Sequence, residues 1–305
     1  MSTLVIRKLR FHETPAFLDL FHQVFGEVSS DDTELTETIW CDVSSERTMS
    51  MTAWIEEELV GLLHAALYQH TLYIVALGVK EEYRRRSVAS RLYQRLMKEC
   101  EGLQITGYRV SDYPYGYIMP GVWQPGGIAF FTSLGFSVES TPVAMERDLR
   151  GFFYDTELGK RKESLISQGY VITQFDKAQA LQVVDFFDRC MAADWKDIIK
   201  FGYIKGTLRD NGICCFNPEG TMIGCTFYGL VGRDLHRFGP IGVDPVIRGL
   251  SIGRILLEEC LLMQHDRGLD RSYFLWCYEN SPAFHMYSRS GFTVTHTMQI
   301  MSKPI

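Results

Sequence analysis

The stretch that decides the fold is Val243-Asp244-Pro245-Val246-Ile247-Arg248-Gly249-Leu250-Ser251-Ile252-Gly253. Small residues at positions 249, 251 and 253 let the backbone pass close to a ligand. The sequence predicts a strand before this loop, over 238–243, and a helix after it, over 254–265. A helix start presents unpaired N–H groups and the positive end of its dipole, so the unit predicts a phosphate-binding site.

The same pattern occurs earlier in the chain. Tyr83–Leu92 (YRRRSVASRL) resembles Ile247–Leu256 (IRGLSIGRIL), and aligning Arg84 with Arg248 gives a shift of 248 − 84 = 164 residues. A nearly constant shift at several positions indicates an internal repeat of pattern. The other matching positions are Gly61 with Gly224, Val79 with Val243, and Leu134-Gly135-Phe136 with Ser290-Gly291-Phe292, at shifts of 163, 164 and 156 residues.

Each half is predicted to follow one order of elements: strand, helix, hairpin, a fourth strand, the loop and its helix, another strand, a short helix and two strands. The polar stretch 150–169 is predicted to be a linker. We therefore predict domains at 1–149 and 168–305. The ranges predicted for the first elements of the two halves are 4–9 and 170–175 (strands), 14–25 and 177–191 (helices), 59–68 and 222–230 (second hairpin strands), and 72–79 and 238–243 (fourth strands).

Composition narrows the class of protein. Of the 305 residues, 46% are hydrophobic and 22% charged, and the net charge of −6 argues against general affinity for nucleic acid or anionic membranes. The eight cysteines form no C-x-x-C pair and lie mostly in apolar runs, which favours free thiols in a reducing compartment. We find no run of about 18 apolar residues and no signal-peptide pattern, and we expect a cytoplasmic protein without a metal site.

The loop resembles the acetyl-CoA pyrophosphate loop of the GNAT superfamily of N-acyltransferases, which reads Arg-x-x-Gly/Ser-x-Gly/Ala between a strand and a helix. The later stretch 280–292 (NSPAFHMYSRSGF) resembles that family's Asn-x-x-Ala-x-x-x-Tyr-x-x-x-Gly-Phe segment. Its counterpart in the first half is 127–136 (GIAFFTSLGF). The resemblance covers nearly the whole chain twice, in a layout similar to mycothiol synthase. It implies an α/β fold of two tandem GNAT-like domains, each a mixed, mostly antiparallel sheet flanked by helices.

The resemblance also implies where the cofactor binds. In the family, acetyl-CoA lies between the fourth and fifth strands, and backbone N–H groups of the loop bind its pyrophosphate. The first-half loop carries Arg85 where the second has Gly249, so we rank it below the second. The implied cofactor-binding residues are Ile241, Val243, Arg248, Gly249, Leu250, Ser251, Ile252, Gly253, Arg254 and Asn280, and in the first half Arg84, Arg85, Arg86, Ser87, Val88 and Ala89.

The tyrosine that precedes Gly-Phe protonates the departing CoA thiolate in many family members. That position is Tyr287 in the second half and Phe131, which has no proton to give, in the first. The resemblance therefore implies a catalytic second domain and a degenerate first one. The predicted reaction is direct attack of an amine on the thioester carbonyl, which a backbone N–H in 238–243 would polarise. Candidate bases, chosen by position only, are His236, Tyr278 and Glu279.

The predicted function is transfer of an acetyl group from acetyl-CoA to a primary amine of a small molecule or peptide, by a monomer or homodimer. Three alternatives remain open: an active first domain, a non-catalytic acyl-CoA-binding regulatory protein, and aminoacyl transfer from tRNA. The acidic balance disfavours the last of these. An insertion at 111–123, rich in aromatic residues, proline and glycine, is predicted to be a loop that packs between the halves or lines a substrate pocket.

Overall fold

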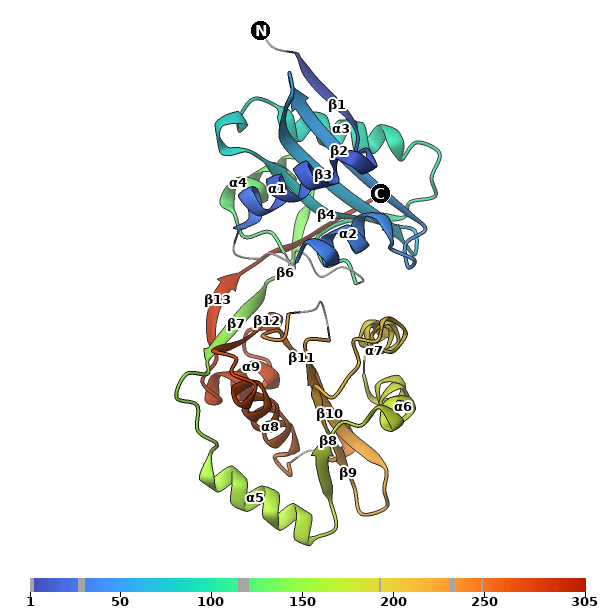
Figure 1. Cartoon of the computed structure of the whole chain (residues 1–305). Coiled ribbons are helices and arrows are strands. Elements are labelled where there is room, and N and C mark those ends of the chain that lie inside the picture. The colour runs from blue at the N-terminus through green and yellow to red at the C-terminus, as the bar shows by residue number, and fades with distance from the viewer. Residues whose placement is uncertain (1–2, 27–30, 115–120, 192, 231–233, 248) are drawn as a thin grey trace. The chain divides into compact units, whose positions relative to one another are not determined.

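The computed structural model describes residues 3–26, 31–114, 121–191, 193–230, 234–247 and 249–305. The chain divides into two compact units (Figure 1). The first unit comprises Met1–Pro142 together with Thr297–Ile305, and the second comprises Val143–His296. None of the described helices combines the length and the apolar character that crossing a bilayer requires.

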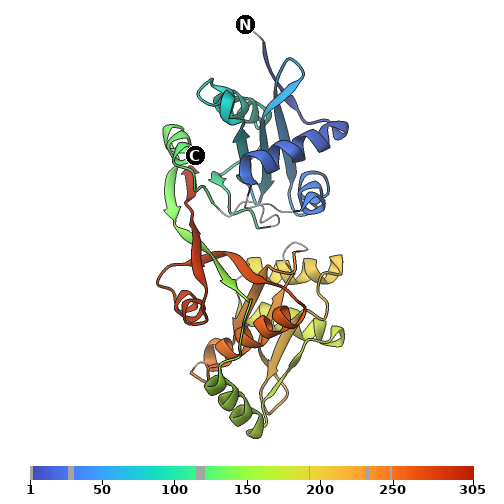
Figure 2. The same ribbon diagram turned by 60° about the vertical axis from the view of Figure 1, so that its left-hand side comes forward.

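A seven-stranded sheet forms the centre of the first unit, in the order β1-β2-β3-β4-β5-β14-β6. Only the β4–β5 pair runs parallel among its described pairs. Helix α1 lies on one side of this sheet and α3 on the other, each over its own apolar cluster (Figure 2). The elements are β1 (Leu4–Lys8), α1 (Thr14–Phe25), α2 (Asp32–Trp40), β2 (Arg47–Ile55), β3 (Glu58–Tyr68), β4 (Thr71–Val79), α3 (Val88–Glu99), β5 (Gly107–Val110), α4 (Pro125–Ser133), β6 (Ser137–Ser140) and β14 (Ile300–Pro304).

The second unit repeats the plan with two smaller sheets, β11-β10-β9-β8 and β12-β7-β13. Helix α8 covers one face of the four-stranded sheet and α6 the other (Figure 1). This arrangement of mixed, mostly antiparallel sheets flanked by helices confirms the predicted fold class. The elements are β7 (Pro142–Asp148), α5 (Thr156–Ser167), β8 (Val171–Gln174), α6 (Ala180–Cys190), α7 (Ala193–Lys205), β9 (Gly212–Phe216), β10 (Met222–Tyr228), β11 (Phe238–Val243), α8 (Ile252–Asp266), β12 (Arg271–Tyr278), α9 (Pro282–Arg289) and β13 (Thr293–Thr297).

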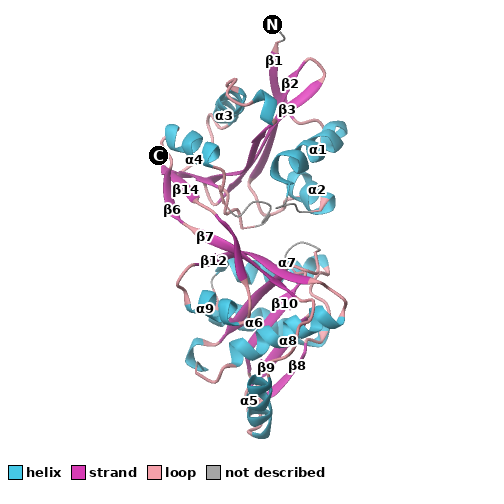
Figure 3. Cartoon of the chain, turned by 90° about the vertical axis from the view of Figure 1, so that its left-hand side faces the viewer, coloured by secondary structure: helices cyan, strands magenta, loops and turns pink. Residues whose placement is uncertain are grey.

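The last strand of the chain belongs to the first unit. Strand β14 lies beside β6 (Figure 3) and pairs antiparallel with both β6 and β5. In the second unit, β7 lies between β12 and β13. The predicted boundaries, 1–149 and 168–305, therefore differ from the structure, because each unit includes a strand that a simple division of the sequence assigns to the other half.

The predicted linker is also different in the structure. Most of it forms helix α5, whose Leu158 and Leu165 are buried in the apolar cluster beneath α8. Asp155 caps the helix by accepting hydrogen bonds from the N–H groups of Glu157 and Leu158. The stretch looked like a linker because most of its residues are polar, but its two buried leucines lie seven residues apart, on one face of the helix.

The repeated glycine of the third strand has a packing reason. A Cβ atom on Gly61 would lie 2.9 Å from Val88 and 3.2 Å from Leu92, both on α3. A Cβ on Gly224 would lie 3.0 Å from Leu256 and 3.5 Å from Ile252, both on α8. In both units the helix that follows the loop thus rests directly on a glycine of the sheet.

We expect Gly61→Val to destabilise the first unit by about 1–3 kcal/mol, because the added methyl groups have no room against α3. Gly107→Val is the matched control, since no atom lies within 4 Å of a Cβ placed there. Urea unfolding of the two variants measures the difference. Equal midpoints would show that α3 is free to shift away from the sheet.

Candidate functional site

The fourth and fifth strands of the first unit part at Ile74. They pair from Thr71 and Gly107 up to Ile74 and Val110, and the N–H of Ser111 still donates to the Ile74 carbonyl at 2.9 Å. Strand β4 then continues alone to Val79. We call this parting the first splay.

A bulge in β4 lies at the start of the first splay. His64 pairs with Ala76 and Ala65 with Ile74, so Val75 has no partner on β3. Beyond the bulge, the N–H of Lys80 donates to Val60 on β3. Because N–H groups alternate in direction along a strand, those of Val79 and Leu77 face the splay.

The loop after β4 brings a helix start to the open end of the first splay. Arg85 and Ser87 have φ values of +63° and +62°, so left-handed residues bend the backbone twice within three positions. The side chain of Ser87, the N-cap of α3, makes no capping hydrogen bond. The N–H groups of the first turn of α3 are therefore available to an anion, and such bent loops form anion-binding concavities.

A cavity of about 860 Å³ occupies the first splay. Arg84 and Arg85 line it, and its lining includes no Asp, Glu, Lys, His, Cys or Tyr among the described residues. Arg86 lies instead over the ring of Tyr83, 5.4 Å from its centre, and is not part of the lining. The cavity therefore combines a cationic loop with an apolar interior, whose other lining residues include Val24, Phe25, Ile74, Val75, Leu77, Val110, Val122, Trp123 and Phe131.

The second unit has the same construction. Strands β11 and β12 belong to different sheets and meet at one bridge between Arg237 and Tyr273. We call the parting beyond this bridge the second splay. Strand β11 also carries an extra residue against its neighbour, because Thr226 pairs with Ile241 and Tyr228 with Phe238.

The predicted strand residues Ile241 and Val243 are oriented toward the second splay. The N–H of the next residue, Asp244, donates to Ile223 on β10 at 2.8 Å. By the same alternation as in β4, the N–H groups of Val243 and Ile241 point away from β10.

The loop of the second unit has the same backbone bends at matching positions. Gly249 has a φ of +96° and Ser251 a φ of +63°, and the side chain of Ser251 makes no capping hydrogen bond to α8. Leu250 lies between them, α8 begins at Ile252, and Gly253 is in its first turn. Arg248 lies outside the described residues, so its role stays a prediction.

Two residues predicted to bind the cofactor, Arg254 and Asn280, have other structural surroundings than the prediction suggests. Arg254 makes an ion pair with Asp155 at 2.6 Å, which ties the start of α8 to that of α5. Asn280 has a left-handed φ of +63°, and Ser281, not Asn280, is the N-cap of α9. Their roles in cofactor binding stay predictions.

Tyr287 contacts both strands of the second splay. Its ring centre lies 4.5 Å from that of Phe274 on β12 and 6.0 Å from that of Phe238 on β11. Burial raises the pKa of the Tyr287 hydroxyl, so the group stays protonated, as a proton donor must. The matching position in the first unit, Phe131, is buried among Phe130 and Phe136 and borders the cavity.

Sequence reasoning missed a residue that holds the second loop. Arg161 of α5 donates hydrogen bonds to the carbonyl oxygens of Gly249 and Leu250, at 3.3 and 3.4 Å. Nothing in the local sequence pattern around Arg161 connects it to a loop 88 residues later. Of the residues in the first-half insertion that are described, Tyr113 is buried and donates to Asp42; positions 115–120 lie outside the description.

No group of three His, Cys, Asp or Glu side chains suited to a metal ion occurs among the residues that the structure describes. The sequence matches no curated protein. Several solved structures are similar in fold. The GCN5-related glucosamine N-acetyltransferase region of a fungal multi-domain GH3 beta-N-acetylglucosaminidase matches 99% of this chain with a TM-score of 0.82 at 14% identity, and this chain spans 38% of that protein.

Two further structures match over nearly their whole length. A tandem GNAT protein from the clavulanic acid biosynthesis pathway has a TM-score of 0.74 at 14% identity, with 99% of this chain and 98% of that chain covered. A GCN5-related N-acetyltransferase from Sphaerobacter thermophilus has a TM-score of 0.71 at 12% identity, with 99% and 95% covered. At these identities the likeness shows the fold.

The match of the sequence to a family model identifies the family. The model of the acetyltransferase (GNAT) family matches residues 14–111 and again residues 177–292, together more than two thirds of the chain. Each match includes one splay and its loop. The chain therefore belongs to the acetyltransferase (GNAT) family and carries the family's fold twice in tandem.

Proposed function

We propose that this protein transfers an acetyl group from acetyl-CoA to a primary amine of a small molecule or peptide. One repeated arrangement carries the proposal: in both units a doubly bent loop and an uncapped helix start stand at the open end of two parted strands. Such a helix start favours a pyrophosphate, and the parted strands leave backbone N–H groups free for the pantetheine arm.

In this proposal the two units have different roles, cofactor binding in the first and acetyl transfer in the second. The first cavity fits a cofactor with an anionic head, because it has arginines at the loop and no carboxylate among its described lining residues. The same lining contains no side chain that titrates near neutral pH. The first unit thus binds acetyl-CoA without turning it over, and the second unit, with Tyr287, performs the transfer.

The transfer follows from the groups at the second splay. A backbone N–H of β11 next to the bulge, which lies between Phe238 and Ile241, polarises the thioester carbonyl. The amine nitrogen bonds to the carbonyl carbon, and the carbon–sulfur bond then breaks. Tyr287 gives its proton to the departing thiolate.

Calorimetric titration with CoA tests the two binding sites. We expect two sites in the wild type and one in the double variant Arg84→Glu/Arg85→Glu, because the charge reversal repels the phosphates. Gly249→Val removes the other site, since a β-branched residue does not adopt φ near +96° without strain. Lys98→Glu, on the exposed last turn of α3 and far from the loop, is the matched control and keeps both sites.

Turnover is measured by release of free thiol from acetyl-CoA with a panel of amines, polyamines, aminoglycosides, amino acids and peptides. If the second unit performs the transfer, Arg84→Glu/Arg85→Glu keeps turnover and Gly249→Val loses it. The opposite result would move the transfer to the first unit. Binding at both sites with no thiol released from any amine would favour the second candidate, an acyl-CoA-binding regulatory protein, for which the inert first cavity is the supporting observation.

A further inference from the structure

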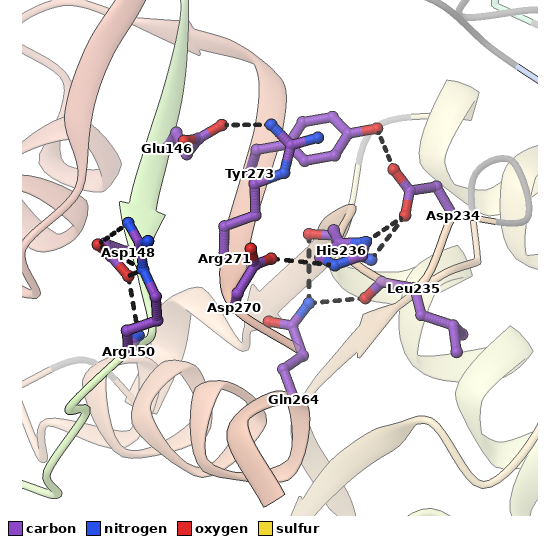
Figure 4. A network of polar contacts seen from close by, with 10 residues as sticks. All are labelled: Glu146, Asp148, Arg150, Asp234, Leu235, His236, Gln264, Asp270, Arg271 and Tyr273. Atoms are coloured by element: carbon purple, nitrogen blue, oxygen red, sulfur yellow. Dashed lines mark hydrogen bonds and ion pairs between the residues drawn. The ribbon is translucent and has the colours of Figure 1, made fainter. Parts of the chain in front are cut away.

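A histidine held by an aspartate lies at the closed end of the second splay. His236 immediately precedes the Arg237–Tyr273 bridge that joins β11 to β12. Its Nδ1 lies 2.8 Å from Asp234, and its Nε2 lies 3.4 Å from Asp270 (Figure 4). Its side chain is 30% exposed, so the ring is open to a small molecule.

Asp234 accepts two further hydrogen bonds that fix its carboxylate beside the ring. It accepts hydrogen bonds from the backbone N–H of His236 at 2.9 Å and from the Tyr273 hydroxyl at 2.8 Å, besides the Nδ1 contact. Burial alone would raise the pKa of Asp234, but the hydrogen bonds from His236 and Tyr273 keep that pKa below its ordinary value. A carboxylate that stays ionised at Nδ1 keeps the proton on that nitrogen and leaves the lone pair on Nε2.

The side chain of His236 is not needed to join the strands. The backbone carbonyl of His236 connects the two strands, because it accepts a hydrogen bond from the N–H of Tyr273 at 2.9 Å. It also accepts one from Gln264 Nε2 at 3.2 Å. The distance from Nε2 to Asp270 is long for a strong hydrogen bond, and the Asp270 side chain is 65% exposed. Nε2 is therefore accessible, with a carboxylate beside it that would stabilise a positive ring.

The reacting atoms would arrive at this end of the splay. The loop that receives the pyrophosphate follows β11, and the bridge that closes the splay precedes it. Strand β11 has six residues, about 20 Å at the usual rise, which an extended pantetheine arm spans. Tyr287 marks the same end, because its ring packs on Phe238, two residues after His236.

We infer that His236 is the general base of the proposed acetyl transfer and that Asp234 is its positioning residue. This inference rests on the proposed function. As the amine nitrogen bonds to the carbonyl carbon, His236 Nε2 takes the proton that the nitrogen loses, and Asp234 and Asp270 stabilise the imidazolium. The carbon–sulfur bond breaks, and Tyr287 protonates the thiolate. The ring then returns its proton, and the phenolate regains one, through water.

The corresponding positions of the first unit, both of them described, carry neither a histidine nor a tyrosine. The 164-residue shift places the buried Leu72 at the position of His236, and the position of Tyr287 is held by Phe131. Acid and base are thus present together in one unit and missing together in the other. This agrees with binding in the first unit and transfer in the second.

The test is the pH profile of turnover in His236→Gln. We expect kcat to fall by about 10²–10⁴-fold with KM for acetyl-CoA unchanged, and the loss of rate at acid pH to disappear from the profile. The wild-type rate rises with pH because the base acts only in its neutral form. Among the described residues, the carboxylates that contact the ring are Asp234 from its own loop and Asp270, which immediately precedes β12, and the Tyr273 hydroxyl of β12 donates to Asp234.

Further variants separate catalysis from structure. Asp234→Asn should lower kcat without changing KM for acetyl-CoA, and imidazole in the buffer should restore part of the rate of His236→Gly. The matched controls are His265→Gln and Asp266→Asn, a second His–Asp pair at 3.1 Å on the exposed end of α8, and both should keep wild-type rates. The melting temperature of each variant shows that it is folded.

Two outcomes overturn the inference in different ways. If the wild type releases thiol and His236→Gln does so at a similar rate with the same pH profile, His236 is not the base and the proposed function stands. If the wild type releases no thiol with any amine, the proposed function fails and the base fails with it.

Discussion

Deleting residues 300–305 should unfold the first unit and abolish its proposed CoA site. Strand β14 pairs with β5 on one side and β6 on the other, and β5 forms one wall of the first splay. Ile300 and Met301 are fully buried, and their burial alone contributes about 3–6 kcal/mol. That is a large share of the stability of a typical domain, about 5–15 kcal/mol.

Calorimetry checks this expectation. The truncated chain should lose one unfolding transition and one of two CoA sites, and the second unit should still bind CoA. Deleting only the exposed Ile305 is the matched control and should change neither. A truncated chain with both transitions intact would mean that the first sheet closes without its inserted strand.

Replacing Tyr287 by Phe should lower kcat by about 10²–10⁴-fold and leave CoA binding unchanged. The substitution keeps the ring packed between Phe238 and Phe274 and removes only the hydroxyl, which is the proposed proton donor. Because the thiolate must then leave unprotonated or take a proton from water, the chemical step slows. Free-thiol release gives the rate, and titration calorimetry gives the affinity.

Tyr203→Phe on the exposed side of α7 is the control for loss of a tyrosine hydroxyl. If Tyr287→Phe keeps the wild-type rate while Arg84→Glu/Arg85→Glu is inactive, transfer takes place in the first unit. The tyrosine would then be a packing residue of the second aromatic cluster.

Local patterns predicted most elements of the fold. Helix α1 and strand β11 have the predicted bounds, and the two loops bend at matching positions, Arg85 with Gly249 and Ser87 with Ser251. These features depend on neighbouring residues, since a small residue, a helix start or an alternating strand is readable within about ten positions. That Arg85 adopts the glycine-like conformation was not predictable from its type, because arginine rarely has a positive φ.

The candidate site was predictable only in part. The residues of the second loop and Tyr287 come from a linear motif, and the structure places Tyr287 against the parted strands to which the motif refers. The cavity of the first unit was not predictable, because its volume depends on how side chains from α1, β4 and α4 leave space between them. The same holds for Arg161, which reaches the second loop from a helix 88 residues away in sequence.

The sequence by itself determined the repeat, most of the order of elements, the family and the place of the two loops for which we predict phosphate binding, because each depends on short-range spacing that recurs at a nearly constant shift. Only the tertiary structure decided that β14 completes the first sheet, that α5 belongs to the second unit, and that Asp234, Asp270 and Tyr273 surround His236. These depend on pairing and packing between distant segments, which a linear pattern does not encode.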